Sequence, residues 1–214
     1  MSDTPKLLPP RPIDWEMRPL ESASTRMETL DDGRLELTID HARLDGVTPR
    51  MLHWWFRTAW QDMEWKGRTY PRYLIWHPID HIRLTIAKRN AAGEVGPGAK
   101  FHIVEAFAGN LDYLVDQVVD VPRLDEGGIT LEVRILGKTL MQLSHTFTGE
   151  PGGTRYHTRM RLGADSGILK PISAVVRQRK FSDEKAHAWL KHNVEEVGNL
   201  PHFLPALYER SAAR

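Results

Sequence analysis

The sequence predicts an α+β fold in which a curved antiparallel sheet packs against one long C-terminal helix. Three observations support this prediction. Segments in the middle of the chain alternate apolar and polar residues with a period of two, as half-buried strands do. Glycine-containing turns separate these segments, which is typical of consecutive antiparallel strands. The last periodic segment has helical spacing instead, and it follows a good helix N-cap.

The chain is expected to form an arm and one domain. Residues 1–15 are rich in proline and lack periodicity, so they predict an extended N-terminal arm. Residues 16–214 contain no internal repeat or low-complexity stretch, and their length is typical of a single domain.

Charge and hydropathy exclude several classes of partner. Lys and Arg number 29 against 28 Asp and Glu, so the net charge is +1, whereas nucleic-acid-binding proteins usually carry a strong basic excess. No apolar run approaches the roughly 18–20 residues needed to span a bilayer. We therefore expect a cytoplasmic protein that binds a small molecule, without a nucleic-acid or membrane partner. A homo-oligomer is compatible with this expectation.

The first predicted elements are a strand and a helix. Residues 33–44 partly alternate and predict the strand. Thr48 followed by Pro49 is typical of a helix N-cap and first helical position. Apolar residues then recur with helical spacing, which predicts a helix over residues 49–62.

A hairpin and three further strands follow. Residues 73–76 form a short apolar run that a proline turn ends. Residues 81–88 and 101–106 flank a turn rich in glycine and predict a hairpin. Further along the chain, three segments separated by glycine-containing turns predict an antiparallel meander: residues 129–136, 138–148 and 154–162.

Residues 183–197 predict the C-terminal helix, with Ser182 as its N-cap and Gly198 just past its end. His192 and Glu196 are four residues apart and share one face of this helix, a spacing that suits two ligands of one metal ion. They lie nearly opposite the helix's apolar stripe, so a solvated face explains them as well. The spacing alone leaves this question open.

The chain has ten His and no Cys, so a zinc or iron site must use His and carboxylate ligands. The segment WHPIDHI offers His77 and His81, of which we expect one to be a ligand. Asp80 either orients a neighbouring side chain or begins the turn. Glu105 shares a strand face with apolar residues, and a buried carboxylate needs a metal ion or an ion pair. A position at the edge of the sheet explains Glu105 as well.

Two further histidines differ in their expected surroundings. His145 shares its strand face with apolar side chains, which places it in the core or in a cavity. A lone histidine on such a face is more often structural than catalytic. His157 alternates with arginines and is expected on a solvated face.

Four motifs together resemble the family of 2,4-diacetylphloroglucinol hydrolase and phloretin hydrolase. They are MLHWWF at 51–56, YLIWHPIDH at 73–81, HIVE at 102–105 and HNVEE at 192–196. The resemblance implies a START-like helix-grip fold, with a strongly bent sheet around the C-terminal helix. It also implies a zinc-dependent hydrolase that cleaves a carbon–carbon bond between an acyl group and a phenolic ring.

Position by position, the resemblance implies a set of site residues. The implied metal ligands are His81, Glu105, His192 and Glu196. Tyr73 matches a tyrosine of the family's substrate pocket, and His145 is the best match to a pocket histidine; both are candidate catalytic residues. Leu84 stands where the resemblance implies a polar pocket residue, so the resemblance supports the ligand set but not the same substrate specificity.

We therefore expect a metal-dependent hydrolase with Zn²⁺, or alternatively Fe²⁺, that acts on an acyl–aryl ketone of a phenolic or similar small apolar molecule. Two other functions fit the same residues. One is a non-catalytic helix-grip carrier of an apolar ligand. The other is a non-haem iron oxygenase that uses two histidines and a carboxylate.

Overall fold

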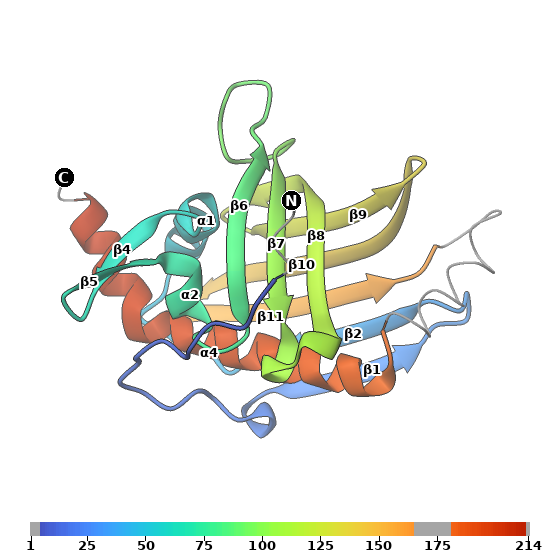
Figure 1. Ribbon diagram of the computed structural model, residues 1–214, viewed down its shortest axis with the longest axis horizontal. Coiled ribbons are helices and arrows are strands. Elements are labelled where there is room, and N and C mark those ends of the chain that lie inside the picture. Colours follow the sequence, from blue (N-terminus) through green and yellow to red (C-terminus); the bar gives the residue numbers. More distant parts are fainter. Residues whose placement is uncertain (1–4, 165–180, 213–214) are drawn as a thin grey trace.

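The computed structural model describes residues 5–164 and 181–212. A nine-stranded antiparallel sheet bends around the long helix α4 (Asp183–Ala212), as Figure 1 shows. The strand order is β1-β2-β11-β10-β9-β8-β7-β6, and β3 also pairs with β11. The predicted α+β helix-grip architecture is therefore confirmed.

Most strands of this sheet, but not all, were predicted from the sequence. The predicted hairpin and the predicted meander are present. Two strands, β1 and β8, were not predicted, and the segment expected as one strand at 33–44 is divided between β2 and β3. The bounds are β1 Ser24–Thr29, β2 Leu35–Asp40, β3 Leu44–Asp45, β6 His81–Lys88, β7 Lys100–Ala106, β8 Leu114–Asp125, β9 Gly128–Ile135, β10 Lys138–Glu150 and β11 Gly153–Leu162.

Two short helices and a small hairpin lie at one end of the sheet. Helix α1 (Pro49–Thr58) begins as predicted, with the Thr48 hydroxyl accepting a hydrogen bond from the Met51 amide at 3.2 Å. It ends four residues before the predicted boundary, because the chain turns into the hairpin of β4 (Asp62–Trp65) and β5 (Arg68–Pro71). The following apolar run forms helix α2 (Arg72–Trp76), all of which is buried. Three single 3-10 turns complete the described structure: Leu20–Ser22, Phe107–Gly109 and Leu111–Tyr113.

The predicted end of the C-terminal helix at Val197 was wrong. Helix α4 continues through Gly198, Pro201 and Pro205 to Ala212. An added Cβ at Gly198 would lie 2.6 Å from the Arg18 side chain, so this glycine allows a close approach and does not cap the helix. The last turns bury Leu200, Phe203, Leu204 and Leu207. Burial of these side chains offsets the helix-breaking tendency of the glycine and the two prolines.

The hydrophobic core has two parts that meet along α4. One part packs α1, α2 and the C-terminal half of α4 against β8, β9 and β10, and includes Trp55, Trp76 and Phe203. The other packs the N-terminal half of α4 against β2 and β11, and includes Trp189 and Val194. His192 and Glu196 therefore lie where the two parts of the core adjoin.

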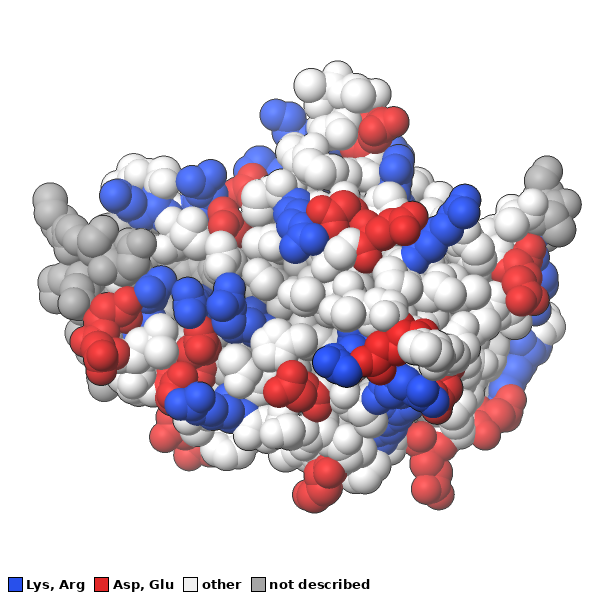
Figure 2. Space-filling model, turned by 180° about the vertical axis from the view of Figure 1, so that it is seen from behind, with Lys and Arg blue, Asp and Glu red and all other residues white. Residues whose placement is uncertain are grey.

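The outer surface carries charges of both signs. Basic and acidic side chains are interspersed on the face seen in Figure 2. No helix among the described residues is long and apolar enough to cross a membrane.

Residues 5–15 contain no helix or strand, and the Trp15 indole stacks on His202 at 4.8 Å between ring centroids. The division of the chain at residue 15 stays a prediction.

Candidate metal centre

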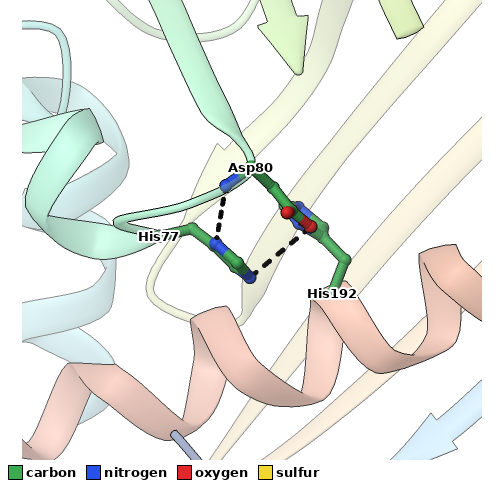
Figure 3. A group of neighbouring side chains, drawn as sticks. All are labelled: His77, Asp80 and His192. Carbon is green, nitrogen blue, oxygen red and sulfur yellow. Dashed lines mark hydrogen bonds and ion pairs between the residues drawn. The ribbon is translucent and has the colours of Figure 1, made fainter. Parts of the chain in front are cut away.

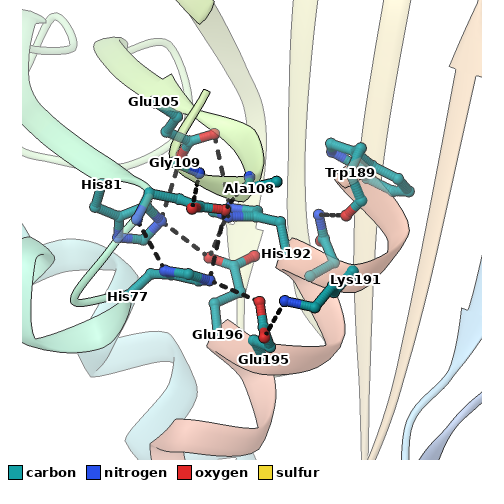
Figure 4. A network of polar contacts seen from close by, with 12 residues as sticks. His77, His81, Glu105, Ala108, Gly109, Trp189, Lys191, His192, Glu195 and Glu196 are labelled. Atoms are coloured by element: carbon teal, nitrogen blue, oxygen red, sulfur yellow. Dashed lines mark hydrogen bonds and ion pairs between the residues drawn. The ribbon is translucent and has the colours of Figure 1, made fainter. Parts of the chain in front are cut away.

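Four ionisable side chains from three elements converge below the sheet. The nitrogen Nε2 of His81 lies 3.6 Å from Glu105 Oε1 and 3.4 Å from Glu196 Oε2. Nε2 of His192 lies 3.8 Å from a carboxylate oxygen of each of the same two glutamates. We call these four residues, which are the four ligands implied by the resemblance, the four-residue cluster (Figure 4).

A β-bulge turns His81 toward this cluster. His81 pairs with Glu105 across the β6–β7 ladder, whereas Arg83 pairs with Val104, so Ile82 is an extra residue. Paired residues share a face and adjacent residues alternate, so the bulge puts His81 and Arg83 on opposite faces. His81 is consequently buried and Arg83 exposed. The simple alternation that the sequence suggests would have placed His81 away from the inner side chains of this strand.

Helix α4 supplies the other half of the cluster. His192 and Glu196 are 2% and 5% exposed, so their face of the helix is covered and not solvated. The spacing of four residues stacks them one turn apart, as the sequence predicted. The structure thus excludes a solvated face for these two residues, and their role as metal ligands stays a prediction.

Hydrogen bonds at Nδ1 orient both histidines. The Nδ1 of His81 lies 2.7 Å from the carbonyl oxygen of Tyr73, which can only accept, so Nδ1 carries the proton. Its Nε2 therefore has a free lone pair, and this atom is buried without a hydrogen-bond partner in the described part of the chain. His192 likewise directs Nδ1 to Asp80 Oδ2 at 3.0 Å. Such partners at the second nitrogen are typical of metal-bound histidines.

The electrostatics of the four-residue cluster favour a bound cation. Burial raises the pKa of Glu105, and it raises that of Glu196 to about 8. Burial opposes the charged ring of His192, yet its hydrogen bond with Asp80 and the charges of Glu196 and Glu105 raise its pKa to about 9. Two buried carboxylates therefore lack full compensation, which a divalent cation would supply.

The donor set fits zinc. Zinc accepts histidine nitrogen and carboxylate oxygen, and tetrahedral ligands at about 2.1 Å from the ion lie about 3.4 Å from one another. Four nitrogen–oxygen separations in the four-residue cluster, 3.4–3.8 Å, are close to this value. One ligand atom each of His81, Glu105 and His192 lie within 4.8 Å of one another. Iron(II) uses the same types of donor.

Asp80 forms the support behind His192. Its carboxylate accepts hydrogen bonds from the amides of Ala108 at 3.0 Å and Gly109 at 2.8 Å, in addition to the one from His192. Burial raises the pKa of Asp80, but the hydrogen bond and charge of His192 outweigh it and lower the pKa to about 2. Asp80 is therefore an ionised anchor for the imidazole and not a turn residue alone.

His77 lies beside the four-residue cluster, but both of its ring nitrogens already have polar partners (Figure 3). Nδ1 accepts a hydrogen bond from the Asp80 amide at 3.1 Å, so Nε2 carries the proton and faces Glu195 Oε2 at 3.3 Å. The ring stacks on His192 with centroids 4.6 Å apart. His77, Asp80 and His192 also lie close enough for a metal ion, but these hydrogen bonds favour His81 over His77 as a ligand.

Tyr73 contacts the cluster directly. Its hydroxyl donates a hydrogen bond to Glu105 Oε1, and its ring stacks on His81 with centroids 3.7 Å apart. Burial raises its pKa well above the usual value, and the charge of Glu105 adds to this effect. The phenol therefore stays protonated at neutral pH and holds the carboxylate in place.

Comparison with known families identifies the family of this chain. The sequence profile of the DAPG hydrolase PhiG domain matches residues 25–209. The chain belongs to the DAPG hydrolase family. This membership indicates a hydrolase, and the family match spans every residue of the four-residue cluster. A comparison with curated proteins found no match.

Solved structures resemble this member of the DAPG hydrolase family at low sequence identity. Protein Ms6760 from Mycobacterium smegmatis is 11% identical, with a TM-score of 0.47, over 82% of this chain and 96% of its own. Protein SA2116 from Staphylococcus aureus is 12% identical, with a TM-score of 0.45, over 85% of this chain and 97% of its own.

His145, the second residue predicted to be catalytic in this DAPG hydrolase family member, lies apart from the four-residue cluster. His145 is buried on β10, with Nδ1 at 2.9 Å from the Thr158 hydroxyl. No hydrogen bond or ion pair joins it to the four-residue cluster among residues 5–164 and 181–212. Its ring stacks on Phe56, which contacts Trp76, and Trp76 contacts His81. As expected, His157 lies on the outer face, where it pairs with Asp40 at 2.7 Å.

Half-buried apolar side chains line the inner face of the sheet. They come from four strands and pack against the core while keeping part of their surface accessible. They are Leu84 and Ile86 on β6, Ile103 on β7, Val133 on β9, and Met141 and Leu143 on β10. Leu84 pairs directly with Ile103, so this part of the inner face is apolar.

Several supporting residues were not predicted from the sequence. They include Glu195 behind His77, and Thr158 with His41 behind His145. A signal was present for Thr158, because it occupies the inward row of β11 between the buried Tyr156 and Met160. A polar residue in a buried row requires a partner.

Proposed function

We propose that this protein is a zinc-dependent hydrolase that cleaves the carbon–carbon bond between an acyl group and a phenolic ring. The observation that carries the proposal is the convergence of His81 and His192, each through Nε2, on the carboxylates of Glu105 and Glu196. Membership of the DAPG hydrolase family supports the reaction class.

The four-residue cluster would hold the metal ion. A zinc ion bound there would supply a Lewis acid that polarises an acyl oxygen or lowers the pKa of a water molecule toward about 7. The side chains of the cluster are held in place by Asp80 and Tyr73 before any ligand binds. This preorganisation keeps the donor atoms oriented without a further entropic cost.

Hydrolysis of an acyl–aryl bond adds hydroxyl to the acyl carbon and a proton to the ring carbon. Tyr73 and His145 are the candidates for positioning and for proton transfer. Tyr73 is a protonated phenol beside Glu105, and His145 is a neutral imidazole, because burial lowers its pKa to about 3. A neutral imidazole can either donate or accept a proton.

The apolar inner face supports an apolar substrate ring. Leu84 and Ile103 form an apolar pair where the family resemblance implies a polar pocket residue at position 84. We expect a substrate whose ring is less polar at this point than diacetylphloroglucinol. Restoring a polar side chain with Leu84→Asn should shift preference toward the more hydroxylated substrate.

The test combines metal analysis with a substrate panel. The purified protein is expected to contain one zinc per chain, and to convert acylated phenols into a carboxylic acid and the deacylated phenol, measured by chromatography and mass spectrometry. Removal of the metal by a chelator should abolish turnover, and zinc should restore it. A protein without metal that binds the phenols unchanged would be a carrier, and iron with oxygen-dependent turnover would identify an oxygenase.

A further inference from the structure

Three buried side chains form a hydrogen-bonded row beneath the sheet. His41 follows β2, Thr158 lies on β11 and His145 lies on β10. The hydroxyl oxygen of Thr158 is 2.9 Å from His41 Nε2 and 2.9 Å from His145 Nδ1. Thr158 is fully buried, while His41 retains 8% of its surface and His145 3%.

The pairing of β11 with β10 and β2 fixes the positions of these three side chains. Thr158 pairs with His145 on one side and with Ile39 on the other. The amide of His41 donates to the Tyr156 carbonyl at 3.1 Å, which anchors the chain just past the end of β2. The two imidazoles therefore reach the hydroxyl from opposite sides.

The hydroxyl group couples the protonation of the two rings. It has one proton, so between two ring nitrogens it donates to one and accepts from the other. Burial keeps both imidazoles neutral by lowering their pKa values, that of His145 to about 3. Each ring then carries a single proton. When the hydroxyl donates to His145 Nδ1, the proton of His145 is on Nε2; when it accepts from Nδ1, Nε2 has a free lone pair.

We infer that His41 and Thr158 are positioning residues that switch His145 between its two neutral tautomers. Through this switch, Nε2 of His145 accepts a proton in one step of the hydrolysis and donates it in the next. The inference rests on the proposed function, in which His145 serves proton transfer. The coupling between the tautomers of His41 and His145 is independent of that reaction.

The proton movements balance over one turnover. When water adds to the acyl carbon, its proton goes to His145 Nε2. The Nδ1 proton then moves to Thr158, the hydroxyl proton moves to His41 Nε2, and His41 Nδ1 releases its proton to solvent. When the carbon–carbon bond breaks, its electron pair stays with the ring carbon, which takes the Nε2 proton. The row returns to its first state as His41 Nδ1 regains a proton.

The coupling can be measured from the ring nitrogens of His145 by ¹⁵N NMR, which distinguishes a protonated from an unprotonated ring nitrogen. His41→Phe should shift both His145 ring nitrogen resonances in opposite directions. In the Thr158→Val background, which lacks the hydroxyl, His41→Phe should have no further effect. Thr158→Ser keeps the hydroxyl and should restore the coupling. His187→Gln changes an exposed histidine that bonds to the Asp183 carbonyl, and serves as the matched control.

Kinetics supply the second measurement. His41→Phe and Thr158→Val should lower kcat about tenfold or more with little change in KM, and Thr158→Ser should recover most of it. His145 resonances unmoved by His41→Phe in a folded, metal-containing protein would overturn the inference. If His41→Phe does not fold, His41→Gln replaces it with the same expected shift. An enzyme without hydrolase activity would refute the proposed function, while the resonances would still decide the coupling.

Discussion

Asp80 accepts a hydrogen bond from Nδ1 of His192 at 3.0 Å, although 112 positions separate the two residues in the sequence. The amides of Ala108 and Gly109 hold the same carboxylate. One buried carboxylate therefore connects the turn before β6, the turn after β7 and helix α4. The orientation of His192 depends on this connection.

Asp80→Asn should weaken metal binding about 10- to 100-fold, because the ring of His192 loses its charged partner. Competition with a chromophoric chelator measures the change in affinity. Asp112→Asn, at an exposed position in a 3-10 turn, is the matched control and should bind metal as the unchanged protein does. Equal affinities for the two variants would contradict the role given to Asp80.

His192→Ala should remove the metal, whereas His157→Ala should retain it. His192 points into the four-residue cluster, and His157 lies on the outer face with Asp40. Elemental analysis of the purified variants gives the metal content per chain. The same metal content in both variants would refute the assignment of the cluster.

His77→Gln should retain a full complement of metal but lower the melting temperature. The substitution disturbs the buried acceptor of the Asp80 amide, and an unsatisfied buried group costs about 1–3 kcal/mol. Thermal unfolding followed by circular dichroism measures the loss. If this variant lost metal as His192→Ala does, His77 would be a ligand in place of His81.

Tyr73→Phe should lower kcat and leave the metal content unchanged. The substitution keeps the ring that stacks on His81 and removes the hydroxyl that donates to Glu105. Metal analysis and steady-state kinetics on the same preparation separate the two effects. Loss of metal from Tyr73→Phe would mean that the phenol serves only to support Glu105.

Acid should destabilise the protein through His145. Burial lowers the pKa of this ring from 6.5 to about 3 in the folded state. As the pH falls below about 6.5, the unfolded chain takes up a proton that the folded chain does not, so the free energy of unfolding decreases by about 1.4 kcal/mol per pH unit until the pH nears 3. His145→Gln lacks this contribution and should show a slope smaller by that amount in urea unfolding from pH 4 to 6. If the free energy of unfolding had the same slope against pH in His145→Gln and in the unchanged protein, the buried, neutral state of His145 would be contradicted.

Regular alternation made most of the sheet predictable from sequence. Strands β10 and β11 alternate over long stretches and are joined by a glycine-rich turn at 149–153, so both were found. Strand β8 was missed because its pairing with β9 shifts between Asp120 and Arg123, around Pro122. Such a shift interrupts the period of two on which the prediction depends.

The four-residue cluster was predictable only in part, because a bulge and tertiary contacts also determine its geometry. The spacing of His192 and Glu196 indicated a shared face, and the family resemblance supplied His81 and Glu105. Nothing in the local pattern indicated that Ile82 would be an extra residue in the ladder, although this bulge decides where His81 points. The connection from Asp80 to Ala108 and Gly109 is tertiary, and a single sequence carries no signal for it.

The position of the β6–β7 connection has a consequence for engineering and for evolutionary change. His81 and Glu105 pair at one end of the two strands, while the loop of residues 89–99 joins the strands at the other end, remote from α4 (Figure 1). The geometry of this half of the cluster is set by strand register and not by loop length. The exposed tip of the loop, residues 91–94, can therefore be exchanged or extended while the spacing of the two ligands is preserved, whereas Val95 and Ala99 belong to the core.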